Sequence, residues 1–177
     1  PILGTKDFID PESLFSFPGL KKVSTPNSAD FCQHIPPPEV VKSVDDSYVF
    51  AGRFSLCLSG WRVLVDTVMD LDQGKLVSAD DMNGDIVMSM APHSNALYYV
   101  QGLNNASIDE IQSEYLDYDS CLTLLRALED NDRGVLIVKE GAIACVKTTE
   151  EQIALVRVDG YYPLETQGVG FSFAILK

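Results

Sequence analysis

The last third of the chain carries the pattern that most constrains the fold. Short runs of β-branched and aromatic residues alternate there with turn-forming pairs such as Glu140-Gly141 and Asp159-Gly160. Runs of this composition form strands, and short turns between them place neighbouring strands side by side in antiparallel order. The pattern predicts an antiparallel meander of four strands, over residues 135–139, 142–148, 153–158 and 170–176.

The residues before this meander show helical spacing. From Ser55 onward, apolar residues recur on one helical face, at Cys57, Trp61, Leu64, Val65 and Val68. Further helices are predicted over residues 107–113 and 120–129, and a buried strand over residues 86–88. Helices that precede a sheet indicate an α+β fold, in which an N-terminal helical part packs on a C-terminal antiparallel sheet.

Proline divides the chain into two parts. Residues 1–43 carry many prolines, including Pro36-Pro37-Pro38. Because proline has no amide proton to donate within a helix or a sheet, we expect these residues to form a proline-rich, irregular N-terminal arm. Its many apolar residues favour docking on the rest of the chain. Residues 44–177 have the length of one domain. Because the first residue is Pro1, we expect the chain to be a piece of a longer protein.

Charge and cysteine content narrow the partners and the compartment. The formal net charge of −13 opposes binding to nucleic acid or to anionic lipid, and the partner is expected to be a protein. No apolar run is long enough to span a bilayer. The four cysteines form no Cys-x-x-Cys pair, so we expect reduced thiols in a cytoplasmic or nuclear, reducing environment, or in a virion. The oligomeric state is left open.

Two short motifs invite a functional interpretation that the sequence does not support. Asp81, Asn83 and Asp85 match inner positions of a calcium-binding EF-hand loop, but Ala79 and Met90 occupy its first and last ligand positions. The sequence therefore predicts neither a metal nor a cofactor. Asn105-Ala106-Ser107 matches the N-glycosylation pattern, but so short a match is common by chance and does not predict a glycan without a sign of secretion.

A cysteine hydrolase requires a thiolate and a histidine that accepts its proton. Only His34 and His93 are available, one in the arm beside Cys32 and the other in a polar loop. Cys57 and Cys145 lie on apolar faces and are interpreted as small buried side chains.

Seven stretches follow one another in an order typical of one protease family. They are Asp45–Phe50, Ala51–Ser55, Asn83–Val87, Ser120–Leu128, Gly134–Val138, Leu155–Tyr161 and Gly170–Leu176. This order resembles the papain-like and OTU-like cysteine proteases typified by the deubiquitinating domain of the herpesvirus large tegument protein. The resemblance implies a papain-like α+β domain over residues 44–177.

The resemblance also implies that the catalytic residues have degenerated. Ser55 stands where the family has its nucleophilic cysteine, Phe54 replaces the oxyanion-hole glutamine, Tyr161 replaces the histidine, and Asp159 alone matches the family. Phenylalanine offers no donor to an oxyanion, and a serine without a base is a poor nucleophile. The expected protein is therefore a catalytically inactive relative of a viral-type deubiquitinase. Its expected role is a protein-binding or scaffold module whose groove is lined by these four residues.

Two alternatives stay open. The first is an active cysteine protease or deubiquitinase that uses Cys57 or Cys32. The second is a viral structural or assembly domain of unrelated fold, in which residues from about Ser55 would not form a helix packed on the C-terminal sheet. The expected partner is ubiquitin, or another viral or host protein.

Overall fold

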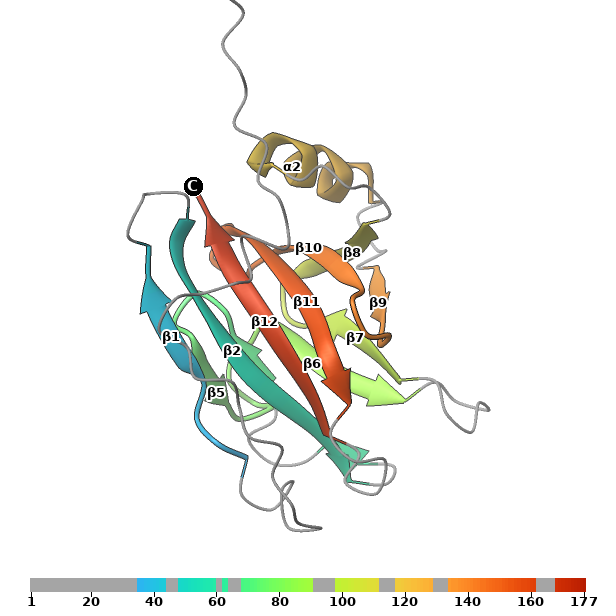
Figure 1. Cartoon of the computed structure of the whole chain (residues 1–177). Coiled ribbons are helices and arrows are strands. Elements are labelled where there is room, and N and C mark those ends of the chain that lie inside the picture. The colour runs from blue at the N-terminus through green and yellow to red at the C-terminus, as the bar shows by residue number, and fades with distance from the viewer. Residues whose placement is uncertain are drawn as a thin grey trace, which may run out of the picture.

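The computed structural model describes residues 35–43, 48–59, 62–63, 68–90, 98–111, 117–128, 134–161 and 168–177. Strands dominate these residues (Figure 1). In chain order the elements are β1 (Glu39–Lys42), β2 (Tyr48–Ser59), β3 (Arg62–Val63), β4 (Val68–Asp70), β5 (Lys75–Val77), β6 (Ile86–Met90), β7 (Tyr98–Gly102), β8 (Ser107–Ile111), α2 (Tyr118–Ala127), β9 (Val135–Ile137), β10 (Ile143–Lys147), β11 (Ile153–Tyr161) and β12 (Gly168–Leu176).

The described strands form two antiparallel sheets. The first sheet has the order β1-β2-β12-β11-β10-β8, and β3 pairs with the end of β2. The second sheet has the order β5-β4-β6-β7-β9. Figure 1 shows β2, β12 and β11 crossing in front of β6 and β7, so the two sheets lie face to face.

Apolar side chains from both sheets fill the space between them. Phe54, Phe171 and Phe173 extend inward from β2 and β12 and form one buried cluster with Met69 of β4 and Met88 of β6. The residues of β12 are buried along its whole length, because it is a central strand covered on both faces. Burial of aromatic and aliphatic area on this scale is the main stabilising contribution to such a fold.

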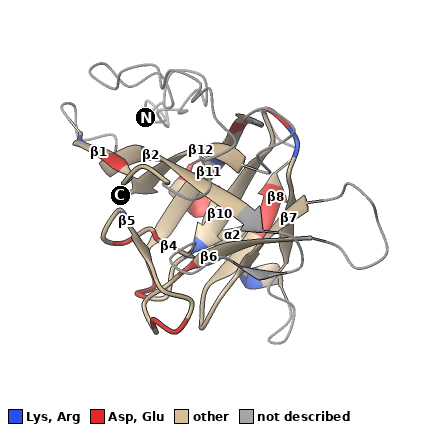
Figure 2. Ribbon diagram, turned by 90° about the horizontal axis from the view of Figure 1, so that it is seen from below, with Lys and Arg blue, Asp and Glu red and all other residues tan. Residues whose placement is uncertain are grey.

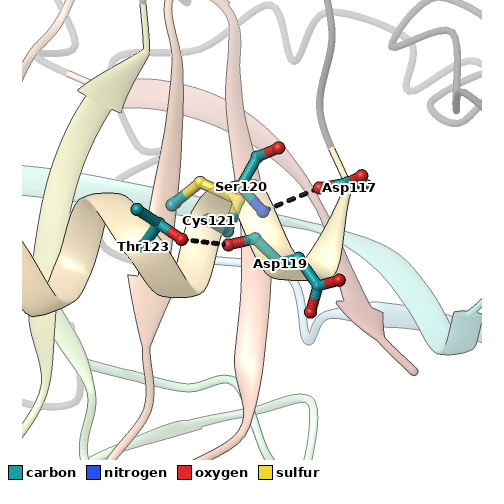
Figure 3. Close-up of a disulfide and its surroundings, with 6 residues drawn as sticks. Asp117, Asp119, Ser120, Cys121 and Thr123 are labelled. Carbon is teal, nitrogen blue, oxygen red and sulfur yellow. Dashed lines mark hydrogen bonds between the residues drawn. A yellow bond between two sulfur atoms is a disulfide. The ribbon is translucent and has the colours of Figure 1, made fainter.

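Helix α2 covers the outer face of the first sheet. Asp117 caps its first turn, where the Oδ1 atom accepts a hydrogen bond of 2.7 Å from the amide of Ser120. Cys121 and Leu125 face the sheet in a second apolar cluster. A disulfide joins Cys121 to Cys145 of β10, with 5.4 Å between their Cα atoms, and so fixes the helix to the sheet (Figure 3).

The structure contradicts the predicted fold class. The α+β, papain-like arrangement placed a helical part before the sheet, whereas the only described helix follows eight strands. Residues 48–59 form strand β2 in place of the helix expected from Ser55, and residues 107–111 form β8 in place of a short helix. Phe54 and Leu56 alternate toward the core on a pleated strand, and pairing with β12 outweighed the weaker 3.6-residue spacing.

Other predictions hold. The helix over residues 120–129 is α2, and β10, β11 and β12 pair as an antiparallel meander. The first strand of the expected meander, β9, pairs instead with β7 in the second sheet. Strand β1 lies within the expected arm, and residues 1–34 lie outside the described residues. None of the described helices could cross a membrane.

Candidate functional site

The expected oxyanion-hole position is part of the core. Phe54 is buried, stacks on Phe171 with 5.0 Å between ring centroids, and meets Phe173 edge-on at 5.7 Å. Ring pairs at these distances are favourable beyond the area that they bury. Phe54 therefore has a packing role between the sheets.

The other expected site residues lie in strands. Ser55 is buried in β2 opposite Gly170 of β12, and Asp159 lies in β11 on the other side of β12. Strands two positions apart in a sheet are separated by on the order of 10 Å. Asp159 accepts hydrogen bonds from the Oγ of Ser172 at 2.6 Å and the Nε of Arg157 at 3.0 Å, so its carboxylate is already engaged. Nothing is described of the side chain of Tyr161.

The described cysteines are not free thiols. Cys121 and Cys145 are joined to each other, and Cys57 is also disulfide-bonded. The expectation of reduced thiols is wrong for these three residues, because a sequence without Cys-x-x-Cys pairs does not reveal which distant cysteines the sheet brings together. Cys32, His34 and His93 lie outside the described residues.

Three carboxylates lie close together near the end of β4 and the start of β6. Asp70 ends β4, Asp72 lies in the turn to β5, and Asp85 directly precedes β6. One carboxylate oxygen from each residue lies within 4.8 Å of the other two. Asp70 and Asp85 are buried and Asp72 is partly buried. These three residues are called the aspartate cluster below.

Local backbone geometry places the first two members of the cluster. The Oδ1 of Asp70 accepts a hydrogen bond of 2.9 Å from the amide of Gln73, which closes the turn between β4 and β5. Gly74 ends this turn with a φ of 63°, a value that favours glycine. A side chain at Gly74 would also approach the Val40 side chain to 2.6 Å. The turn is therefore tight, and it directs Asp70 and Asp72 to the same side.

Asp85 connects two turns through backbone amides. Its Oδ2 accepts a hydrogen bond of 2.7 Å from the amide of Leu71, and its Oδ1 accepts one of 2.6 Å from the amide of Thr149. Thr149 belongs to the turn between β10 and β11 of the first sheet, whereas Leu71 follows β4 of the second sheet. The Asp85 carboxylate therefore joins the two sheets.

Asp72 makes a second connection to the same turn of the first sheet. The hydroxyl of Thr148 donates to its Oδ1 at 2.8 Å, and the amide of Glu150 lies 3.3 Å from its Oδ2. The carboxylates are thus oriented by donors from two separate segments, and they do not depend on one flexible loop for their position.

Burial makes this concentration of negative charge unfavourable. Removal from water raises the pKa of Asp70, Asp72 and Asp85, and it raises that of Asp72 to about 6. Hydrogen bonds to the carboxylates act in the opposite direction, while the charge of Asp85 further raises the pKa of Asp70 and Asp72. The cluster is therefore a place where a proton or a cation would be stabilised.

The Oδ2 atom of Asp70 is the clearest sign of an unmet requirement. Asp70 is fully buried, and no hydrogen-bond donor among the described residues reaches this oxygen. The Nζ of Lys75 lies 3.9 Å away, within ion-pair range but too far for a hydrogen bond. Lys75 donates instead to the Oε1 of Gln73 at 2.8 Å. A buried carboxylate oxygen without a donor is costly.

The aspartate cluster is not evident from the sequence alone. The EF-hand pattern includes Asp85 as a ligand position beside Asp81. In the structure the Oδ1 of Asp81 instead accepts a hydrogen bond of 2.9 Å from the amide of Asn83. The available signal was Asp70-Leu71-Asp72, two acidic residues spaced by one at the end of a buried strand. The pairing of β4 with β6, which brings Asp85 beside them, could not be read from the sequence.

Comparison with known proteins adds no further assignment: no protein-family model, no curated protein and no solved structure matches this chain.

Proposed function

We propose that this domain is a non-catalytic module that binds a basic protein surface through its acidic end. The acidic end consists of the aspartate cluster, the exposed Glu150 and Glu151 of the turn that donates to Asp72, and the exposed Asp80 of the turn after β5. Glu151 lies 3.6 Å from the ammonium of Lys147, which offsets part of its charge. Figure 2 shows acidic residues along the loops beside β4. This concentration of one charge, in a chain of net charge −13, is the observation that carries the proposal, because such fields steer association with oppositely charged partners.

The residues at the expected catalytic positions already have structural partners, which supports the proposal that the module is non-catalytic. Phe54 packs in the core, Asp159 is bound by Arg157 and Ser172, and Cys57 is disulfide-bonded, so it offers no thiolate for the alternative protease mechanism. The papain-like groove is not part of this proposal, because the described residues form two antiparallel sheets and not a papain-like fold. Ubiquitin, which only the resemblance implied, becomes a partner to be tested. A structural or assembly role is compatible with the same surface.

The disulfides favour an oxidising compartment. Cys121 and Cys145 form a buried disulfide. Structural disulfides persist mainly in secreted proteins or in oxidising organelles. This environment replaces the cytoplasmic or nuclear, reducing one expected from the sequence. A virion surface is also oxidising and fits the same chemistry.

Charge reversal at the acidic end tests the proposed function. Fluorescence anisotropy would follow the binding of a labelled lysine-rich peptide and, in parallel, of labelled ubiquitin. The double variant Glu150→Lys with Glu151→Lys should weaken peptide binding about tenfold or more at low salt, because it adds repulsion at the contact. The matched control is Glu140→Lys, an exposed residue in the turn at the opposite end of β10.

Two results would contradict the proposal. Glu140→Lys changes the net charge by the same amount as Glu150→Lys alone, and equal weakening of peptide binding by these two single variants would show that only the net charge matters. Saturable ubiquitin binding that the Glu150 and Glu151 changes leave intact would place the binding surface elsewhere. Covalent trapping of the chain by a ubiquitin-based thiol probe would refute the non-catalytic part.

A further inference from the structure

Among the described residues, the negative charge of the aspartate cluster exceeds the positive charge that lies beside it. Three carboxylates face one another within 4.8 Å, and the ion pair with Lys75 is long at 3.9 Å. The Lys75 side chain is 47% exposed, so water screens much of its attraction. Glu150 adds a fourth negative charge close enough to act on Asp70 and Asp72. The cluster therefore combines an excess of negative charge with a buried oxygen that no donor in the described part of the chain reaches.

We propose that Asp70, Asp72 and Asp85 bind a divalent cation, and that the cation is calcium. A cation would supply the missing partner for the Oδ2 of Asp70 and would neutralise the repulsion among the three carboxylates. Carboxylate oxygens are the ligands that hard divalent cations prefer. This inference does not depend on the proposed protein-binding role, because it rests on the buried carboxylates and not on the exposed acidic residues.

The spacing of the oxygens favours calcium over magnesium. Three points separated by no more than 4.8 Å lie within about 2.8 Å of a common centre. Calcium binds oxygen at about 2.3–2.6 Å and tolerates irregular geometry, whereas magnesium requires about 2.0–2.1 Å and near-octahedral angles. The cluster needs only a small contraction to reach the calcium distance, and a larger one to reach the magnesium distance.

The surroundings allow the rest of the coordination shell to form. Asp72 is only partly buried, so the cluster is open to solvent on its side. Calcium takes about 6–8 oxygen ligands, and water or a backbone carbonyl can supply those that side chains do not. The exposed Glu150 lies in the turn whose amide donates to Asp72, and its charge acts on both Asp70 and Asp72.

Calcium at this position would couple the two sheets. Asp70 ends β4 and Asp72 lies in the turn after it, while the Thr148 hydroxyl that donates to Asp72 and the Thr149 amide that donates to Asp85 come from the turn after β10. A ligand that binds only the folded arrangement stabilises it in proportion to its concentration over its dissociation constant. Calcium binding should therefore raise the melting temperature.

The test is a thermal melt of the full 177-residue chain in metal-free buffer, repeated with CaCl₂ or MgCl₂. We expect calcium to raise the melting temperature by several degrees at millimolar concentration, and magnesium at the same concentration to raise it much less. Asp70→Asn should melt higher than the wild type without calcium, because it removes a buried charge, and should lose the calcium response. Asp80→Asn, an exposed neighbour in the acidic turn, is the matched control and should keep it.

A second variant is available if Asp70→Asn does not fold. Asp72→Asn then replaces it, because Asp72 is less buried. Calcium titration by calorimetry should show that this variant binds calcium about tenfold or more weakly than the wild type. Three results would overturn the proposal. They are a wild-type melting temperature that calcium does not raise at concentrations up to about 10 mM, equal increases with calcium and magnesium, and an unchanged increase with calcium in Asp70→Asn.

Discussion

Acidification should stabilise this protein when it is free of metal. Burial raises the pKa of Asp72 from 3.8 to about 6 and raises the pKa values of Asp70 and Asp85 in the same direction. The folded state therefore binds protons more tightly than the unfolded state. This contribution to the free energy of unfolding is fully present below pH 3.8 and is lost as the pH rises through about 6. Most proteins rich in paired carboxylates behave in the opposite way.

The size of the effect follows from Asp72. Its rise to about 6 corresponds to about 3 kcal/mol between the fully protonated and fully ionised limits. Between pH 7.5 and pH 5, linkage assigns about 1.4 kcal/mol of this to the folded state. Partial exposure of Asp72 reduces the expected gain to about 1 kcal/mol, because water screens the charge. Asp70 and Asp85 add to it with the same sign.

Urea denaturation measures this gain directly, since urea adds no ionic strength. In buffers freed of metal, the midpoint should rise by roughly 0.5 M between pH 7.5 and pH 5. Asp72→Asn should show a smaller rise, because the substituted side chain does not titrate. The reasoning is refuted if the midpoint of the wild type falls over this range, or if wild type and Asp72→Asn respond equally to pH.

Three further predictions concern the rest of the fold. Replacing both Cys121 and Cys145 with Ala should lower the free energy of unfolding by about 3 kcal/mol, given the sequence separation of 24 residues, and a loss below about 1 kcal/mol in urea would contradict a closed disulfide. Phe171→Ala should lower the free energy of unfolding by about 3–5 kcal/mol, because it removes a buried ring that stacks on Phe54, and a near-neutral effect would contradict that packing. In a secretory host, exposed Asn105 should carry a glycan that peptide N-glycosidase removes and that Asn105→Gln lacks, whereas an unmodified secreted chain would contradict its accessibility.

The sequence predicted the elements whose signals are local. Helix α2 has a capping aspartate and an apolar face, and β10, β11 and β12 are β-branched runs divided by short turns. For these elements, propensity, turn chemistry and final pairing all agree. The strand β6 was also predicted, because its apolar run follows a turn cluster directly.

The prediction failed where pairing partners are distant in sequence. Residues 48–59 carry apolar residues that suit both a helical face and a pleated strand, and the choice depends on β12, more than 100 residues later. Residues 107–111 also form a strand where a helix is predicted. The wrong fold class therefore comes from two segments that pair as strands in the first sheet.

The candidate site was hidden for the same reason. Asp70 and Asp72 are separated by one residue in the sequence, but Asp85 joins them only through pairing of β4 with β6. The donors from Thr148 and Thr149 arrive from the other sheet. No local pattern encodes burial of the Asp70 carboxylate, which is the feature that distinguishes this cluster from an ordinary acidic turn.

The decisive measurement for calcium binding at the aspartate cluster is a crystal structure obtained in the presence of calcium. Anomalous diffraction recorded on both sides of the calcium absorption edge would identify the ion. We expect one anomalous peak at about 2.3–2.6 Å from a carboxylate oxygen of each of Asp70, Asp72 and Asp85. A peak-free cluster in which the Lys75 ammonium has moved into hydrogen-bond contact with the Oδ2 of Asp70 would contradict it.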